Sequence, residues 1–242
     1  MRTLKFGLLL CFSILASACS PAPEAGPSVH IALSPAAQPV STAVAACMPN
    51  DENLAATLDI RYTHFVDLDE VDFFVQLGEP AELPEFAAQL AWEEIVVIVH
   101  AENELELSRS HFMDLFSGRV EDWSELGGEA RAVSLWVGPE GDEARQAFET
   151  LVLLGGPVTG SANLATNPED VLAAVAADPA AAGILPAAWA DETVRAIELE
   201  VELSVLALAV EEPSGAARQL LACLQSEVGQ AALAELYSPL EP

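Results

Sequence analysis

Residues 94–128 are EIVVIVHAENELELSRSHFMDLFSGRVEDWSELGG, and this stretch decides the fold class. Its beginning, residues 94–99, is rich in β-branched side chains, which is typical of a strand buried on both faces. A helix follows, because Ser108 is a good N-cap residue and Gly118 is a good terminating residue. The apolar side chains of this helix share one face: Phe112, Leu115 and Phe116. A buried strand followed by an amphipathic helix predicts an α/β unit.

The same alternation of strands and helices extends along the rest of the chain. Further strands are expected at 29–33, 58–62, 71–77, 132–137, 183–185, 194–199 and 203–210. Further helices are expected at 34–47, 142–153, 167–177, 218–224 and 228–236. The clearest helix start is Asn167 followed by Pro168, an N-cap residue with proline in the first helical position. This order predicts an α/β fold with a largely parallel sheet.

The composition of the chain is apolar and strongly acidic. Of its 242 residues 52% are hydrophobic, and nine Lys and Arg stand against 38 Asp and Glu, which gives a formal net charge of −29. The apolar content supports a packed core and argues against a disordered chain. A surface this negative repels nucleic-acid phosphates, so we expect no nucleic-acid partner. It also lacks the basic patch that docks proteins on anionic lipid headgroups.

The N-terminus has the features of an export signal. Arg2 and Lys5 precede an apolar segment, residues 6–18, which is too short to span a bilayer. Small residues then precede Cys19, as in the lipobox of bacterial lipoproteins, where that cysteine is acylated. The alternative is ordinary signal-peptidase cleavage at the A-x-A sequence of residues 16–18. Both processes export the chain, so we expect a cell-envelope protein, either lipid-anchored to the outer face of the cytoplasmic membrane or periplasmic.

The cysteines agree with export. Cleavage of the predicted signal peptide, residues 1–18, removes Cys11. The lipidation site, Cys19, begins a Pro-rich linker, residues 19–28, that would serve as a tether. Cys47 and Cys223 remain, and one pair of cysteines in an oxidising compartment predicts a disulfide. The alternative is two buried free thiols, since cysteine is a common core residue.

Signatures of catalysis are missing from the sequence. It contains no G-x-S-x-G nucleophile elbow, no P-loop and no dinucleotide-binding glycine motif. The four histidines show no metal-ligand spacing. The acidic clusters at 67–70 and 102–106 lack the fixed spacing of an EF-hand loop, so solvated loops explain them better than calcium sites. We therefore expect neither an enzyme nor a bound metal or cofactor.

Three segments together resemble one protein family. Residues 114–128 carry D-L-F-S-G-x-V-x-D-W-S-E-L-G-G. Residues 167–186 begin N-P-E-D-V and end D-P-A-A-A-G-I-L-P, and residues 225–230 are Q-S-E-V-G-Q. These segments resemble the phosphate-binding family of periplasmic binding proteins, the solute receptors of ABC importers. The resemblance covers residues 92–236.

This resemblance implies a type II binding-protein fold, in which two α/β lobes hold a solute in the cleft between them. Two crossing strands form the hinge, near Val99 and Leu203, and ligand closes the lobes by rotation about them. Lobe 1 would comprise 29–98 plus 203–242, and lobe 2 would comprise 99–202. The implied partners are a small-molecule solute and an ABC permease, and we expect a monomer that meets the membrane only through its lipid anchor.

The chain departs from the family at the phosphate site. In the family an Arg, an acidic residue and a Ser-Gly-Thr turn open the lobe 2 helix and hold the anion. The aligned positions here are Gly138, Glu140 and the turn Asp142-Glu143-Ala144. The aspartate that accepts the phosphate proton aligns with Leu77. The family also has a Ser-rich loop between its second and third strands. Here only residues 66–70 are left to form that loop.

The ligand-binding candidates are therefore few. Ser34, at the end of the first strand, is the one hydroxyl that matches the family, and Arg145 either reaches the cleft or is a solvated helix residue. The full candidate set is Ser34, Glu140, Gly141, Asp142, Glu143 and Arg145. Carboxylates at a helix start disfavour phosphate and favour a polar neutral or cationic ligand bound by Ser34 and Asp142.

Two functions remain open from the sequence. The first is an exported solute-binding lipoprotein that serves an ABC importer, with a solute other than phosphate. The second is a binding-protein fold without transport, acting as a surface sensor or protein-interaction module. In the second case Asp142 is only a helix cap and the cleft binds nothing.

Overall fold

The computed structural model describes residues 28–48 and 55–240. The predicted signal peptide, the lipidation site Cys19 and the linker up to residue 27 lie outside these ranges. Within them, no helix is both long and apolar enough to cross a membrane.

The strands form one eight-stranded sheet in the order β2-β1-β3-β8-β4-β7-β5-β6. The strands are β1 (Ser28–Leu33), β2 (Ala55–Ile60), β3 (Phe73–Leu77), β4 (Phe86–His100), β5 (Ser134–Val137), β6 (Asn163–Leu164), β7 (Ala181–Pro186) and β8 (Val194–Ala209). The α-helices are α1 (Ser41–Cys47), α2 (Arg109–Phe116), α3 (Glu143–Ala147), α4 (Pro168–Ala177), α5 (Gly215–Leu224) and α6 (Glu227–Leu233). Short 3-10 turns are η1 (Gln38–Val40), η2 (Thr63–Phe65), η3 (Leu68–Glu70), η4 (Trp123–Leu126) and η6 (Ala187–Trp189).

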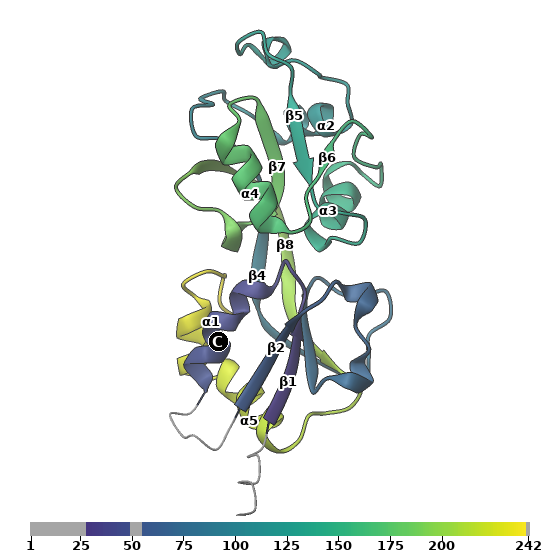
Figure 1. The fold of residues 1–242 in the computed structure, drawn as a ribbon, viewed down its shortest axis with the longest axis vertical. Helices are drawn as coiled ribbons and strands as arrows, with labels where there is room; N and C mark the ends of the chain where they lie inside the picture. Colours follow the sequence, from purple (N-terminus) through teal and green to yellow (C-terminus); the bar gives the residue numbers. More distant parts are fainter. Residues whose placement is uncertain (1–27, 49–54, 241–242) are drawn as a thin grey trace, which may run out of the picture.

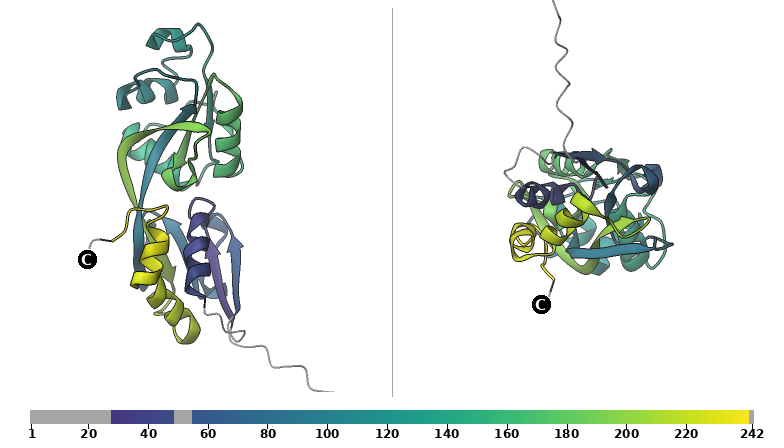
Figure 2. Two further views of the ribbon diagram at one scale, coloured as in Figure 1. Left: turned by 90° about the vertical axis from the view of Figure 1, so that its left-hand side faces the viewer. Right: turned by 90° about the horizontal axis from the view of Figure 1, so that it is seen from below.

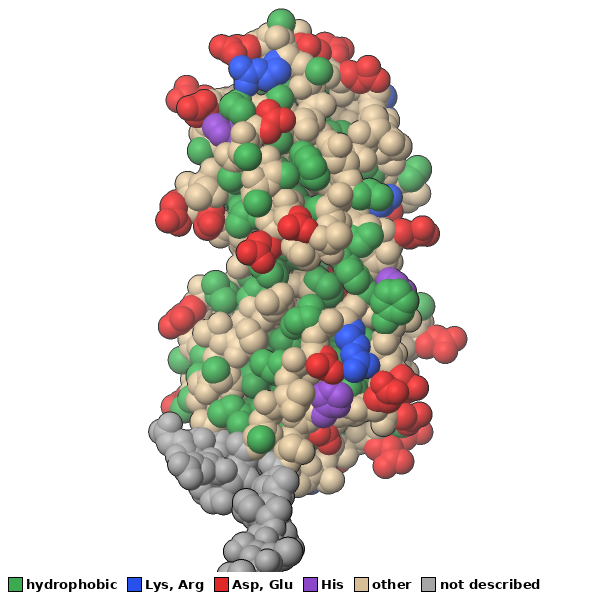
Figure 3. Space-filling view, in the orientation of Figure 1, with side chains coloured by type: hydrophobic (Ala, Val, Ile, Leu, Met, Phe, Trp, Pro, Cys, Tyr) green, Lys and Arg blue, Asp and Glu red, His purple; other side chains and the backbone are tan. Residues whose placement is uncertain are grey.

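Two long antiparallel strands, β4 and β8, run the length of the sheet and connect two lobes (Figure 1). Lobe 1 contains β1–β3, α1, α5 and α6, and lobe 2 contains β5–β7 and α2–α4. The molecule narrows where the lobes meet, and acidic side chains are scattered over both (Figure 3). The α/β fold is thus confirmed, whereas the residue boundaries of the lobes stay a prediction.

The sheet is mixed, so the prediction of a largely parallel sheet is wrong. The pairs β1–β2, β1–β3, β5–β6 and β5–β7 are parallel, but β3–β8, β4–β8 and β4–β7 are antiparallel. The antiparallel pairs arise because β4 leaves lobe 1 and β8 returns to it, which places two opposed strands in the middle of the sheet. The separate strands expected at 194–199 and 203–210 are one continuous strand.

The strand that starts the decisive stretch is buried on both faces, as its β-branched run predicts. Ile95, Val97 and Val99 pack on one face with the phenylalanines of α2. Val96 and Ile98 pack on the other face against α4. This alternation fixes the register of β4 in lobe 2, because a shift by one residue would exchange the two sets.

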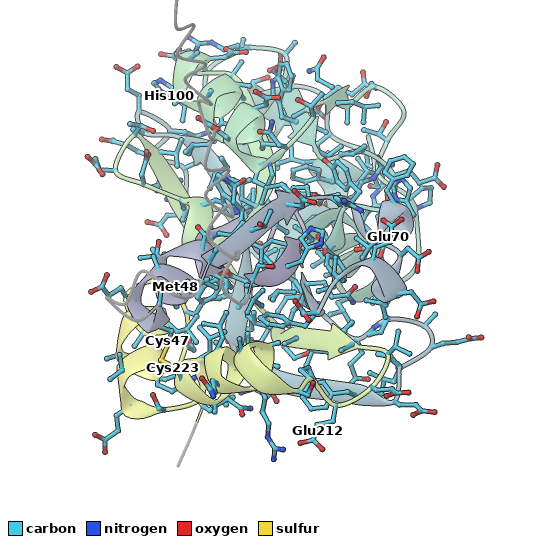
Figure 4. The ribbon with its side chains drawn as sticks, turned by 60° about the horizontal axis from the view of Figure 1, so that its bottom comes forward. Cys47, Met48, Glu70, His100, Glu212 and Cys223 are labelled. Carbon is cyan, nitrogen blue, oxygen red and sulfur yellow. A yellow bond between two sulfur atoms is a disulfide. The ribbon has the colours of Figure 1, made fainter. Side chains whose placement is uncertain are left out.

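Lobe 1 is closed by its helices and by a covalent bond. α1 packs against α5 and α6 on one face of the sheet (Figure 2). A disulfide joins Cys47, at the end of α1, to Cys223 in α5, with Cα atoms 5.7 Å apart (Figure 4). The bond spans a sequence separation of 176 residues, so it ties the first helix of the lobe to its last segment.

Two expected helices are shorter than the sequence indicates. After Ser34 the chain makes turns and the short η1 before α1 begins at Ser41. The helix expected at 142–153 is α-helical only over α3, and Phe148–Val152 continues it as a π-helix. This wider turn buries Phe148 and Val152 in the lobe 2 core.

Candidate solute cleft

On the lobe 1 side, the site begins where β1 ends. Ser34 is fully buried, and its backbone N–H donates to the Val75 carbonyl at 2.8 Å. Its hydroxyl accepts from the backbone N–H of Ala37 at 3.2 Å. Parallel strands β1 and β3 end together here, which is where ligands bind in open α/β sheets.

On the lobe 2 side, a glycine turn follows β5 and leads into α3. Gly141 has a φ of 91°, a left-handed conformation that favours glycine. Asp142 then caps α3, since its side chain accepts from the backbone N–H of Arg145 at 2.9 Å. A Cβ atom at position 138 would lie 2.4 Å from the Asp142 Cγ, so no side chain fits at Gly138 while Asp142 holds this cap.

The carboxylate of Glu143 joins the two lobes. Its Oε1 atom accepts from the Thr63 hydroxyl at 3.4 Å, and the nearby Ser34 hydroxyl acts to lower the pKa of this carboxyl group. The side chain is only 7% exposed, and its Oε2 atom has no hydrogen-bond partner. A lobe 2 carboxylate therefore accepts from a lobe 1 hydroxyl at the place where the family resemblance predicts an anion.

Burial sets the protonation of these carboxyl groups. It raises the pKa of Glu143 to about 7, against the Ser34 hydrogen bond, and the charge of Asp142 raises it further. Burial also raises the pKa of Asp142, although the backbone N–H and the charge of Arg145 oppose this shift. Ionising either carboxyl group in the closed cleft therefore costs free energy.

Two candidates lie away from this contact. Glu140 is exposed. The guanidinium of Arg145 pairs with Glu149 at 3.0 Å and donates to the Gly138 carbonyl at 3.2 Å. The positive charge of Arg145 is therefore paired within lobe 2, and its guanidinium does not bind the lobe 1 hydroxyls.

Further hydrogen bonds hold the lobes together directly. The Tyr62 hydroxyl donates to the Thr166 carbonyl at 2.5 Å. The indole N–H of Trp189 donates to the Ala36 carbonyl at 3.0 Å. Together with Glu143, these groups connect the two sides of the cleft through the chain's own hydrogen bonds.

Beside Glu143 the cleft opens into a cavity of about 430 Å³. Both lobes line it, with Thr63, His64, Gln76, Gly78, Glu79 and Pro80 on one side and Gly141, Glu143, Gln146, Thr150 and Leu151 on the other. Leu77 and Leu203 complete the lining, so the cavity lies next to the crossing strand β8. This is the size of a pocket for a small organic solute.

Gln76 is the least expected residue in the cavity wall. It lies on β3 in the run FFVQL and is 3% exposed. Its amide Nε2 donates to the Gly78 carbonyl at 3.0 Å, whereas its Oε1 has no partner. A single polar residue inside a buried apolar strand is the sequence signal that identifies it.

The lobe 1 loop also differs from the prediction. β2 ends at Ile60, not at 62, so residues 61–72 connect it to β3 instead of 66–70 alone. Thr63 lies in this longer loop and supplies a hydroxyl to the cleft. A loop is therefore present where the family resemblance predicts one. It supplies the Thr63 hydroxyl where the family has serine hydroxyls.

A second cavity of about 340 Å³ lies in lobe 2, away from the cleft. Its lining includes Trp123, Arg131 and Pro179 and comes from lobe 2 alone. Across the described ranges, no cluster of three or more His, Cys, Asp or Glu side chains could hold a metal ion.

A comparison with known protein families identifies the family of this chain. The profile of the PBP superfamily domain matches residues 81–241. The chain belongs to this family. The predicted resemblance to the binding-protein superfamily is confirmed with it, and no curated protein sequence matches.

Solved structures share the fold of this PBP-family chain. A putative phosphate ABC transporter substrate-binding protein from Clostridium perfringens, with bound phosphate, has a TM-score of 0.80 and 18% identity, over 88% of this chain and 100% of that one. An ABC-type phosphate transport receptor from Vibrio cholerae has a TM-score of 0.64 and 17% identity, over 88% and 100%. A reduced form of OxyR from N. meningitidis has a TM-score of 0.64 and 16% identity, over 88% and 99%. The type II two-lobe fold is therefore confirmed.

Proposed function

We propose that this protein is an exported, lipid-anchored solute receptor of an ABC importer, and that its solute is not phosphate. The export signal and the cysteine at the lipobox position support export and anchoring. Membership of the PBP family and a two-lobed cleft with a solute-sized cavity support a receptor. Its structural relatives include receptors for phosphate, so the choice of solute depends on the residues of this cleft.

The position of Glu143 carries the exclusion of phosphate. Its carboxylate accepts from the Thr63 hydroxyl and lies near the Ser34 hydroxyl, and an anion would need both hydroxyls as donors. Once it is ionised, a like charge at about 4 Å costs on the order of 4 kcal/mol at an effective dielectric constant near 20. That energy corresponds to about three decades of affinity. Arg145, two residues further along the same helix, is already paired with Glu149.

A second function is favoured by the bonds that cross the cleft. Tyr62, Trp189 and Glu143 connect the lobes through the chain's own groups. A binding-protein fold that closes in this way would present a fixed surface to a partner protein and act as a sensor or interaction module. Solute binding separates the two functions, because only a receptor needs it.

A thermal-shift panel tests the proposal on the chain without residues 1–18 and with Cys19→Ser. The panel contains phosphate, sulfate, sugars, amino acids and amines at pH 8. A solute at a hundred times its Kd stabilises by about 2.7 kcal/mol, which raises the Tm of a domain this size by roughly 5–10 °C. A shift with a solute other than phosphate supports the receptor. A shift with phosphate overturns the solute claim, and no shift with any solute favours the interaction module.

A further inference from the structure

Two buried acceptor atoms without partners belong to residues that line the same cavity from opposite lobes. They are the Oε1 of Gln76 on β3 and the Oε2 of Glu143 in α3. Both side chains are more than nine-tenths buried, at 3% and 7% exposure. Buried polar atoms are normally paired, so two orphans on one cavity indicate a missing donor.

Neighbouring contacts fix the orientation of both groups. Gln76 cannot exchange its amide atoms, because its Nε2 donates to the Gly78 carbonyl and an oxygen there would face another oxygen. Glu143 uses its Oε1 for Thr63, which leaves Oε2 without a partner. The site therefore presents an amide oxygen and, once Glu143 is ionised, a carboxylate oxygen, and both then accept only.

The surrounding charges favour a cation. The titratable groups around Glu143 are Asp142 beside it, Tyr62 in the segment leading to η2, and His64 and Glu79 on the cavity wall. Arg145 is the nearby guanidinium and is paired with Glu149. Burial raises the pKa of Tyr62 to about 12, and the negative charges of Asp142 and Glu143 add to this shift.

We infer that the cavity binds a small organic cation, an ammonium-bearing solute whose N–H groups donate to Gln76 Oε1 and Glu143 Oε2. This inference rests on the proposed receptor function and names its solute class. Ammonium groups supply three donors and no acceptor, which matches two orphan acceptors. Calcium would need six to eight oxygen ligands, more than these two side chains provide.

Entry requires the lobes to separate. The two orphan oxygens have almost no solvent contact in the closed cleft, so the ammonium reaches them only when lobe 2 moves away from lobe 1. β4 and β8 are the two strands that connect the lobes and permit this movement. Closure then places the cation between the two acceptors and shields the charge pair from water.

The test compares three four-carbon probes of similar size at matched millimolar concentrations: n-butylamine, 1-butanol and sodium butyrate. At pH 8 we expect n-butylamine to raise the Tm, butanol to have little effect and butyrate to have none. Glu143→Gln should weaken the amine affinity at least about tenfold, because a charge-assisted hydrogen bond is lost. Gln76→Leu should weaken it by a smaller factor, and Glu211→Gln, an exposed acidic residue far from the cavity, should leave it unchanged.

Proton release provides a readout that a structural role would not change. Binding of an ammonium favours ionised Glu143, so amine affinity should rise as the pH increases through about 7. Calorimetry in two buffers of different ionisation enthalpy should show protons released on binding near pH 6.5, and none in Glu143→Gln. Circular dichroism on each variant checks that it folds.

The outcomes separate this inference from the receptor function. Amine binding no tighter than butanol binding, or an affinity unchanged in Glu143→Gln, overturns the cation site. If a sugar or another solute of the panel binds while n-butylamine does not, the receptor function stands and the cation inference fails. If no solute binds, the receptor function itself fails.

Discussion

The Thr63 hydroxyl lies 3.4 Å from the Glu143 carboxylate, so that a donor of lobe 1 meets an acceptor of lobe 2 across the cleft. In a receptor for an anion the solute would provide that acceptor. Here the protein provides it, at the price of a buried carboxyl group whose pKa is raised to about 7. The first prediction follows from that burial.

Glu143→Gln should stabilise the protein at pH 8. The folded protein favours the protonated carboxyl, so the contribution of Glu143 to stability is complete below its ordinary pKa of 4.5 and is lost as the pH rises through about 7. The amide removes that loss, and we expect a gain of about 1–3 kcal/mol at pH 8. Urea unfolding at pH 5 and pH 8 measures it. Equal stability of variant and wild type at pH 8, or the gain appearing in Glu211→Gln as well, contradicts this expectation.

A second buried carboxyl group predicts the same pH trend in lobe 1. Glu93 on β4 is 1% exposed; its Oε1 accepts from the Ala188 backbone N–H at 3.3 Å, and its Oε2 has no partner. Burial raises its pKa to about 8, and the backbone hydrogen bonds only partly oppose this. Stability should therefore fall from about pH 4.5 to pH 8, and Glu93→Gln should flatten that fall by a few kcal/mol. A wild-type unfolding free energy that rises between pH 5 and pH 8 would refute it.

Reduction of the Cys47–Cys223 disulfide should lower stability strongly. The chain-entropy account gives about 5 kcal/mol as an upper value for a loop that closes 176 residues. We expect dithiothreitol to lower the Tm of the wild type and to have no effect on the double variant Cys47→Ser, Cys223→Ser. A wild-type Tm that is insensitive to reduction argues against a stabilising bond.

Tyr62→Phe should loosen the closed cleft without unfolding either lobe. It removes the donor to the Thr166 carbonyl, a hydrogen bond worth about 0.5–1.5 kcal/mol, and retains the ring. Small-angle scattering should show a larger radius of gyration for this variant than for the wild type. Glu211→Gln serves as the control, and an unchanged radius in Tyr62→Phe would mean that this bond does not hold the lobes.

Local sequence signals predicted those parts of the fold that depend on neighbours in the chain. The β-branched run at 95–99 gave the buried strand, and α4 begins at Pro168 with its Asn167 cap accepting from Asp170 at 2.8 Å. The length of β4 and β8 was not predictable, because their polar residues near the crossing break the apolar pattern. There the register shifts between Glu94 and Val96.

The candidate site was only partly predictable from the sequence. Asp142 and Glu143 were singled out by their place in the family pattern, where their charge predicted a cleft that disfavours phosphate. Only the packing of lobe 1 buries Glu143, through Ser34 and Thr63, which lie 109 and 80 positions away in sequence. Thr63 was missed because nothing local indicates that it lines a cavity shared with lobe 2, and Gln76 was missed although its polarity within an apolar strand is a usable signal.

The central claim, that this cleft does not bind phosphate, is tested most directly by calorimetry. The chain without residues 1–18 and with Cys19→Ser is titrated with inorganic phosphate at pH 8, above the pKa of Glu143. We predict no binding heat beyond dilution. Binding with a micromolar or tighter Kd would contradict the account, because the Glu143 carboxylate could not then hold the anion's place.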